Sequence, residues 1–275
     1  MKEYPPRKTN ELNTQAFCEM IGRCGVDHII VDFDDTLIDT SGTFNQGLDN
    51  AAAVLLFGQK PNNIHEAQKA RHIRDTIIIP TIRGLAPRYV VHPIISETAL
   101  RHTARQLDIN EDSNLFAKAL LEVEAIYTTL KPKIFADTAQ FINACQNTNC
   151  FLVLATIAER EWTSKKLSWS GLSGKFNEVI CLDVTIPKGL QLENMLLNLG
   201  AWPENTLFIG DSLASDMHLV TNGKAHGVWV NRRPANYNNL SVCDRNNFAQ
   251  AVNEHRLVMA NNLISAANLA SGWLK

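Results

Sequence analysis

Acidic residues follow two apolar segments of this sequence, in a pattern that suits metal-assisted chemistry. Asp32 and Asp34 stand at the end of the first segment, and Asp211 and Asp216 follow Gly210 at the end of a later one. Carboxylates that cluster in a low dielectric repel one another, and a hard divalent cation with oxygen ligands removes that cost. Mg²⁺ favours a few carboxylates together with water and substrate phosphate. These aspartates therefore predict a magnesium site.

The same residue types can transfer a phosphoryl group. A carboxylate can attack phosphorus and form an aspartyl phosphate, and a second carboxylate can protonate the leaving oxygen and then deprotonate the attacking water. Thr156 follows another apolar segment, and Lys188 follows Pro187. A hydroxyl and an ammonium can bind the non-bridging phosphate oxygens, where charge must be stabilised. The complete set is typical of phosphoryl transfer.

Alternating strands and helices must bring these side chains together. Residues 27–34 contain an apolar run without alternation, which is typical of a strand covered on both faces. Strands are predicted at 150–155, 178–182, 206–209 and 226–230, and helices at 137–147, 159–170, 189–199 and 213–222. This order indicates βαβ units, and therefore an α/β fold with a Rossmann-like parallel sheet. Ligands of such sheets bind outside the carboxyl ends of the strands, so we expect one crevice that holds all the polar groups.

A helical block interrupts the alternation after the first strand. Helices are predicted near 43–58, 62–78, 94–108 and 111–130, and the second is expected to end before Pro80. We expect an α/β core of residues 1–40 and 131–275, with a loose N-terminal arm and C-terminal helices at 245–255 and 256–272. Residues 41–130 are expected to form an inserted helical domain.

The composition narrows the classes of partner. The 275 residues are 45% hydrophobic and carry a formal net charge of −2, so neither nucleic acid nor an anionic membrane is an expected partner. The first residues have no apolar stretch behind their charges, and the six cysteines form no C-x-x-C pair. We therefore expect a cytoplasmic protein with reduced thiols and no zinc site. The sequence leaves a monomer and a homodimer open.

The motifs resemble those of the haloacid dehalogenase (HAD) superfamily. The segment Asp32-Phe33-Asp34-Asp35-Thr36 is similar to the first motif of that family, D-x-D-x-T. Gly210-Asp211 through Asp216 is similar to the acidic fourth motif, G-D-x-x-x-x-D, while Thr156 and Lys188 fit the second and third motifs. All four occur in order, within roughly residues 26–232. The resemblance implies a Rossmann-like core with an inserted helical cap.

The resemblance also implies a role for each aspartate. Asp32 would be a metal ligand and the nucleophile that becomes phosphorylated. Asp34 would be the general acid and base, with its backbone carbonyl on the metal ion. Asp211 would bind the metal ion directly, and Asp216 would act through water or as an orienting neighbour. The inserted helices would form a C1-type cap, which closes over the substrate and selects the leaving group.

Thr156 and Lys188 would bind the phosphoryl group if the resemblance holds. The third motif of the family often reads Lys-Pro, whereas Lys188 is preceded by proline and followed by glycine. Lys165 and Lys166, in the preceding predicted helix, are therefore alternatives for this role.

The implied activity is a Mg²⁺-dependent phosphatase that acts on a small phosphorylated metabolite. A phosphomutase, a phosphonate hydrolase and a non-catalytic binding module that retains the fold are alternatives. A dehalogenase would need neither the second carboxylate of the first motif nor a metal ion, so Asp34, Asp211 and Asp216 argue against that activity.

A basic segment of the predicted cap has two interpretations. Arg83, Arg88 and His92 stand close together in the sequence. They could recognise a second anionic or polar group of the substrate, or they could belong to a solvated connector.

Overall fold

A computed structural model describes residues 13–85, 93–183, 185–232 and 241–270. The predicted N-terminal arm, residues 1 to about 10, lies outside these ranges. The chain divides into two compact units: a core unit, Met1–Ile38 with Ile134–Lys275, and a helical unit, Asp39–Lys133. The chain passes from the core unit to the helical unit in the short strand β2 (Ile38–Asp39), and it returns to the core unit in the short strand β3 (Lys133–Ile134).

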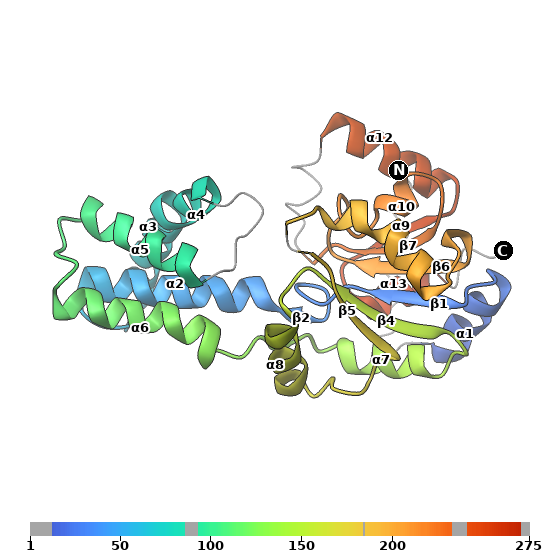
Figure 1. Ribbon diagram of the computed structural model, residues 1–275, viewed down its shortest axis with the longest axis horizontal. Coiled ribbons are helices and arrows are strands. Elements are labelled where there is room, and N and C mark those ends of the chain that lie inside the picture. The colour runs from blue at the N-terminus through green and yellow to red at the C-terminus, as the bar shows by residue number, and fades with distance from the viewer. Residues whose placement is uncertain (1–12, 86–92, 184, 233–240, 271–275) are drawn as a thin grey trace. The chain divides into compact units, whose positions relative to one another are not determined.

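The core unit is built on a six-stranded sheet with the order β5-β4-β1-β6-β7-β8 (Figure 1). Its strands are β1 (His28–Val31), β4 (Phe151–Thr156), β5 (Glu178–Cys181), β6 (Thr206–Gly210), β7 (His226–Val230) and β8 (Leu257–Ala260). Every neighbouring pair is parallel. The predicted α/β fold with a Rossmann-like parallel sheet is therefore confirmed.

Helices cover both faces of this sheet. They are α1 (Thr14–Arg23), α7 (Thr138–Gln146), α8 (Arg160–Ser170), α9 (Lys188–Leu199), α10 (His218–Thr221), α12 (Val242–Asn253) and α13 (Leu263–Ala270), with a 3₁₀ turn, η2 (Pro203–Asn205). Ile29 and Val31 of β1 pack in a cluster with apolar residues of α1, α7 and α13. Ile30 packs in a second cluster with residues of α9, α10 and α12. Because successive strand side chains point to opposite faces, the apolar run without alternation reflects burial on both sides.

The helical unit contains α2 (Thr40–Phe57), α3 (Ile64–Ile73), α4 (Ile79–Leu85), α5 (Pro93–Gln106) and α6 (Asn114–Thr128). Its own apolar core contains Leu48 of α2, Ile82 of α4 and Phe116 of α6. In Figure 1, α2 and α6 run side by side, and these two helices contact each other extensively. Within the residues that the structure describes, every helix is too short or too polar to cross a lipid bilayer.

One predicted helix end is wrong, because the chain remains helical through Pro80. Between α3 and α4 it forms a π-helix, η1 (Arg74–Ile78), and Pro80 is the second residue of α4. A proline lacks the N–H that an interior helical residue donates, but it is tolerated in the first turn. The wider π turn directly before α4 lets the chain pass the proline without leaving helical geometry.

The C-terminal region also differs from the prediction of one helix over 256–272. Leu257–Ala260 instead forms β8, which pairs parallel with β7, and α13 begins at Leu263. Three of its four residues are buried, a pattern that does not distinguish a strand from a helix over so short a segment, so pairing with the edge of β7 decides the outcome. The predicted helix at 213–222 is shortened to α10, because residues 213–217 form turns instead.

Candidate active site

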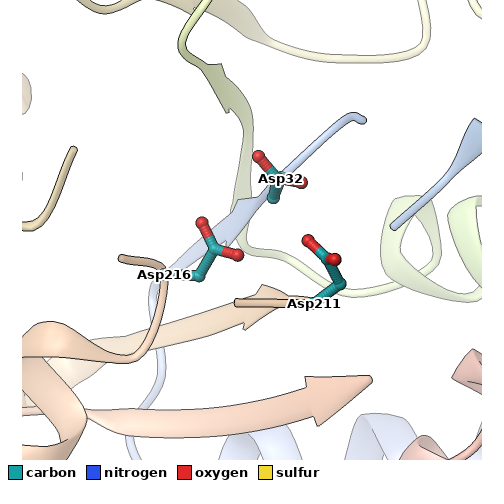
Figure 2. Close-up of side chains that lie close together, drawn as sticks. All are labelled: Asp32, Asp211 and Asp216. Carbon is teal, nitrogen blue, oxygen red and sulfur yellow. The ribbon is translucent and has the colours of Figure 1, made fainter. Parts of the chain in front are cut away.

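The carboxyl edge of three central strands positions the predicted site residues. Val31 of β1 pairs with Leu154 of β4 and with Ile209 of β6. Asp32 directly follows β1, and Asp211 directly follows β6. Figure 2 shows both side chains at this edge, with Asp216 beside them. The sheet register therefore places residues from distant parts of the chain at the same level.

The loop after β1 turns back on itself immediately after the first aspartate. Leu37 N–H donates to the Phe33 carbonyl at 2.9 Å, and Asp35 N–H donates to the Ile38 carbonyl at 2.7 Å. Asp35 adopts φ 61°, in the left-handed region where aspartate is among the better tolerated residues. The buried Phe33 and Leu37 side chains anchor the loop in the core. This turn holds the Thr36 hydroxyl 2.9 Å from Oδ2 of Asp32, to which it donates.

Three carboxylates gather at the site. Asp32, Asp211 and Asp216 each offer an oxygen, and these atoms lie within 4.8 Å of one another. Burial raises the pKa of Asp32 to about 7, and the Asp216 and Asp34 charges add to that rise while Lys188 opposes it. Burial, followed by the Asp32 and Asp216 charges, raises the pKa of Asp211 to about 9. The negative charges of Asp32 and Asp211 are therefore disfavoured without a cation, and the oxygen donors of the three residues fit a hard divalent cation such as Mg²⁺.

Asp216 reaches the cluster by folding back over the end of β6. Its Oδ2 accepts a hydrogen bond from the Ser212 N–H at 2.9 Å, and its own N–H donates to the Ser212 carbonyl at 2.9 Å. A Cβ atom on Gly210 would lie 2.3 Å from that Oδ2. Glycine is therefore required by the close approach of the carboxylate.

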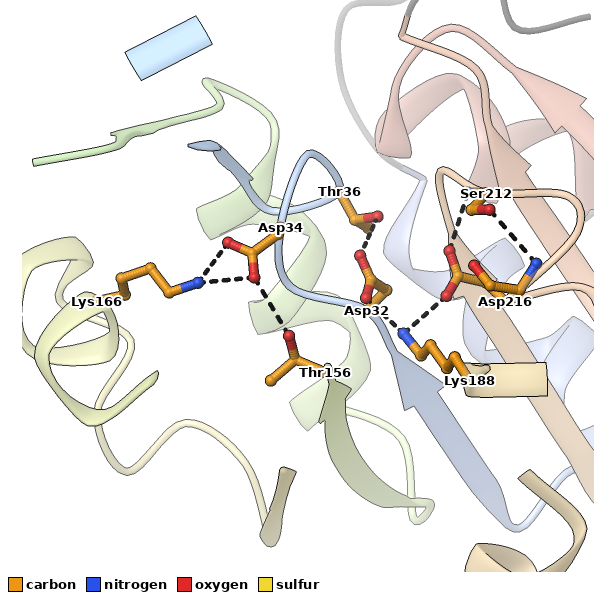
Figure 3. Close-up of polar contacts among 9 residues, drawn as sticks. Asp32, Asp34, Thr36, Thr156, Lys166, Lys188, Ser212 and Asp216 are labelled. Atoms are coloured by element: carbon orange, nitrogen blue, oxygen red, sulfur yellow. Dashed lines mark hydrogen bonds and ion pairs between the residues drawn. The ribbon is translucent and has the colours of Figure 1, made fainter. Parts of the chain in front are cut away.

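Lys188 reaches the acidic cluster. It is the first residue of α9, and its Nζ lies 2.5 Å from Oδ1 of Asp32 and 2.7 Å from Oδ1 of Asp216. Burial by itself lowers the pKa of Lys188, but the Asp216 and Asp32 charges outweigh it and raise the pKa above its usual value. Lys188 is thus an ammonium between two carboxylates, as Figure 3 shows.

The two alternative lysines lie elsewhere. Lys165 is half exposed and pairs with Glu161 at 2.8 Å on the surface of α8. Lys166 is buried, and its Nζ donates to Asp34 at 2.5 Å and 2.7 Å, to Oδ1 and Oδ2 respectively. Neither has a described contact with Asp32, so the structure favours Lys188 as the lysine beside that aspartate.

Thr156 and Asp34 form a second polar group beside the acidic cluster. The Thr156 hydroxyl, at the end of β4, donates to Oδ2 of Asp34 at 3.2 Å. In Figure 3 the Asp34 side chain points toward Thr156 and Lys166, and Asp32 points toward Lys188. The Asp34 carboxylate is not part of the group of three carboxylates within 4.8 Å. Metal binding by the Asp34 backbone carbonyl stays a prediction.

Sequence reasoning missed the side chain that fixes the loop after β1. Arg232, just after β7, donates to the Thr36 carbonyl at 2.8 Å and to Asp137 at 3.0 Å. Its guanidinium lies over the Phe135 ring, 3.8 Å from the centroid. Asp137 also accepts from the Leu263 N–H at 2.6 Å. The only sequence signal for Arg232 is its place at the carboxyl end of a predicted strand.

The basic segment of the helical unit is only partly described. Arg83 is an exposed residue of α4, whereas Arg88 and His92 lie outside the described residues. Both interpretations of the segment therefore stay open.

Solved structures of low sequence identity share this fold. A haloacid dehalogenase-like family hydrolase from Xanthomonas campestris is 14% identical, with a TM-score of 0.64 over 90% of this chain and 96% of that one. The L-2-haloacid dehalogenase from Xanthobacter autotrophicus is 17% identical, with a TM-score of 0.53 over 90% and 99%. A HAD-hydrolase from Bacillus subtilis, solved bound to magnesium, is 16% identical, with a TM-score of 0.53 over 76% and 90%.

The family of the chain follows from its sequence. No curated protein sequence matches it. A family model described as a haloacid dehalogenase-like hydrolase matches residues 26–218, which is more than half of the chain and includes Asp32, Thr156, Lys188, Asp211 and Asp216. The chain therefore belongs to the haloacid dehalogenase-like hydrolases.

Proposed function

We propose that this protein is a Mg²⁺-dependent phosphatase that hydrolyses a small phosphorylated metabolite through an aspartyl phosphate on Asp32. The observation that carries the proposal is that Asp32, Asp211 and Asp216 offer carboxylate oxygens within 4.8 Å of one another, with the Lys188 ammonium paired to Asp32 and Asp216. Phosphoryl transfer requires a cation at the site and a nucleophile beside it. The three carboxylates offer ligands for the cation, and the Asp32 carboxylate is also the nucleophile.

In the first half of the reaction, Asp32 attacks phosphorus and the bond from phosphorus to the leaving oxygen breaks. Thr36 and Lys188 hold one oxygen each of the Asp32 carboxylate, which fixes its orientation. Asp34 gives a proton to the leaving oxygen, so the alcohol departs neutral. Mg²⁺ held by Asp32, Asp211 and Asp216 would offset the negative charge on the phosphoryl oxygens.

In the second half, Asp34 takes a proton from a water molecule that attacks the aspartyl phosphate. The bond between phosphorus and the Asp32 oxygen breaks, inorganic phosphate leaves, and both carboxylates return to their starting state. Lys188 remains beside Asp32 throughout, where its positive charge favours departure of the carboxylate. We further propose that the helical unit acts as the cap that selects the leaving group.

Asp34 supports phosphatase over dehalogenase chemistry. A dehalogenase needs a carboxylate nucleophile, but it needs neither a proton donor for a leaving alcohol nor a metal ion. The L-2-haloacid dehalogenase from Xanthobacter autotrophicus is 17% identical, so the likeness to it shows the fold alone. Asp34 has a use as the proton donor, and Asp211 and Asp216 as metal ligands, in phosphate ester hydrolysis, whereas halide displacement needs neither a proton donor nor a metal ion.

The test is phosphate release from a panel of phosphorylated metabolites, with Mg²⁺ and with EDTA, for the wild type and Asp32→Asn. We expect release that requires Mg²⁺ and that falls at least about 10³-fold in the variant, because the nucleophile is lost. Asp112→Asn, at an exposed position of the helical unit, is the matched control and should retain full activity.

Trapping of the intermediate separates the rival activities. Acid quenching with a radiolabelled substrate should leave label on the wild type and none on Asp32→Asn. Label that is passed to a second metabolite and not to water would instead indicate a phosphomutase. Undiminished phosphate release by a folded Asp32→Asn variant would contradict the mechanism.

A further inference from the structure

Lys166 occupies a position where a charged side chain is costly. Its side chain is 2% exposed, and it shares the buried side of α8 with Thr163 and Leu167. Burying an ammonium without a partner carries a large desolvation penalty, so a lysine here must be paired. The Phe33 ring lies 5.2 Å from Nζ, and the Asp34 carboxylate is the anion in reach.

Three hydrogen bonds converge on the Asp34 carboxylate. Lys166 donates to Oδ1 at 2.5 Å and to Oδ2 at 2.7 Å, and the Thr156 hydroxyl donates to Oδ2 at 3.2 Å. The Asp34 side chain is 28% exposed, so its carboxylate still reaches solvent while Lys166 is enclosed. One rigid helix and the end of one strand therefore hold the carboxylate in a single orientation.

Stability alone does not account for this pair. Replacement of a buried ion pair by apolar side chains of similar size is often neutral or stabilising. Thr163 and Leu167 show that this side of α8 packs against the apolar interior. A group that transfers protons, in contrast, loses rate when its orientation is not fixed, because small displacements of a reacting group are costly.

We infer that Lys166 is a positioning residue, which orients the Asp34 carboxylate for proton transfer to the leaving group and from the attacking water. The inference rests on the proposed phosphatase function. It gives Lys166 a role distinct from that of Lys188, which contacts the nucleophile Asp32 directly. Lys166 acts through Asp34, and its removal leaves the acidic cluster and Lys188 in place.

The test compares four proteins on phosphate esters whose leaving groups differ in basicity: the wild type, Lys166→Met, Asp34→Asn and the double variant. Lys166→Met should lower kcat by about 10- to 100-fold, the range expected when a catalytic group is displaced by about 1 Å. The loss should follow the loss in Asp34→Asn from substrate to substrate. In the Asp34→Asn background, Lys166→Met should change kcat by less than about twofold, because the group it positions is already absent.

Lys165→Met is the matched control. It removes the neighbouring lysine, whose side chain is 51% exposed and pairs with Glu161, and it should leave kcat and KM unchanged in both backgrounds. The melting temperature of each variant reports folding. If Lys166→Met does not fold, the positioning role is tested by comparing the kcat of the double variant with that of Asp34→Asn. The double variant lacks both the ammonium and the carboxylate, so no unpaired charge is buried in it.

The outcomes separate the inference from the function on which it rests. A further loss of about twofold or more when Lys166→Met is added to Asp34→Asn would overturn the positioning role. A rise in KM with unchanged kcat would also overturn it, and would assign Lys166 to substrate binding. Failure of the wild type to release phosphate from any ester with Mg²⁺ would overturn the proposed function and the inference together.

Discussion

Gly210 lies so close to Asp216 that a Cβ atom on residue 210 would be 2.3 Å from Oδ2 of the aspartate. The contact links the last residue of β6 to a carboxylate of the acidic cluster. The Ser212 N–H holds the same oxygen at 2.9 Å, so the carboxylate has little freedom to move aside. The absence of a side chain at Gly210 therefore allows the Asp216 carboxylate to lie at its present position.

Gly210→Ala should displace Asp216 and weaken metal binding. Outer partners that orient metal ligands typically account for 10- to 100-fold in affinity, and we expect a loss of about that size. Overpacking should also destabilise the fold by about 1–3 kcal/mol. Titration of activity with Mg²⁺ measures the first effect, and urea unfolding measures the second.

Gly22→Ala is the control for that substitution. Gly22 lies in α1, and a Cβ atom there would meet nothing within 4 Å. Alanine should therefore stabilise the helix by about 0.5–1 kcal/mol and leave the Mg²⁺ dependence unchanged. Equal Mg²⁺ affinity in Gly210→Ala and the wild type would show that Asp216 does not need its present position.

Lys188→Met should destabilise the protein strongly, because it leaves two buried carboxylates without their ammonium. Loss of one partner of a buried ion pair typically costs about 3–5 kcal/mol. Saturating Mg²⁺ should recover part of this loss, since the cation supplies positive charge to Asp32 and Asp216. Urea unfolding with Mg²⁺ and with EDTA measures both effects, and Lys165→Met, which removes an exposed lysine, is expected to match the wild type.

Metal-free protein should lose stability as the pH rises. The pKa values of Asp32 and Asp211 are raised in the folded state to about 7 and about 9, above those of an unfolded chain. The folded state therefore binds more protons than the unfolded state between about pH 4 and pH 9, and the stability that these protons supply is lost through that range.

Mg²⁺ should reverse this trend, because cation binding requires the deprotonated carboxylates. The rise in melting temperature on adding Mg²⁺ should be larger at about pH 8.5 than at about pH 5.5, two values that both lie inside the range over which the folded state holds extra protons. Free Mg²⁺ at about 100 times its dissociation constant should raise the free energy of unfolding by about 2.7 kcal/mol. Thermal unfolding with Mg²⁺ and with EDTA at both pH values checks this; an equal rise at both would contradict proton-linked binding.

The strands of the sheet were predictable from the sequence wherever several consecutive residues are apolar. The apolar runs before Asp32, Thr156 and Asp211 are contiguous, and each became a strand whose carboxyl end carries the polar residue. Leu257–Ala260 was mistaken for part of a helix, because four residues are too few for period 2 and period 3.6 to differ. Its strand depends on the edge of β7, which is a tertiary partner.

The site shows the same division between local and tertiary information. The sequence by itself determined which residue types follow each strand, because a buried strand and the turn after it are encoded in adjacent residues. It could not determine which lysine serves which aspartate. Lys188 and Asp32 are 156 positions apart, and Lys166 and Asp34 are 132 apart, so only the packing of α9 and α8 against the sheet brings each pair together. The tertiary structure thus decided the electrostatic partners, since Coulomb interactions act through space and leave no pattern along the chain.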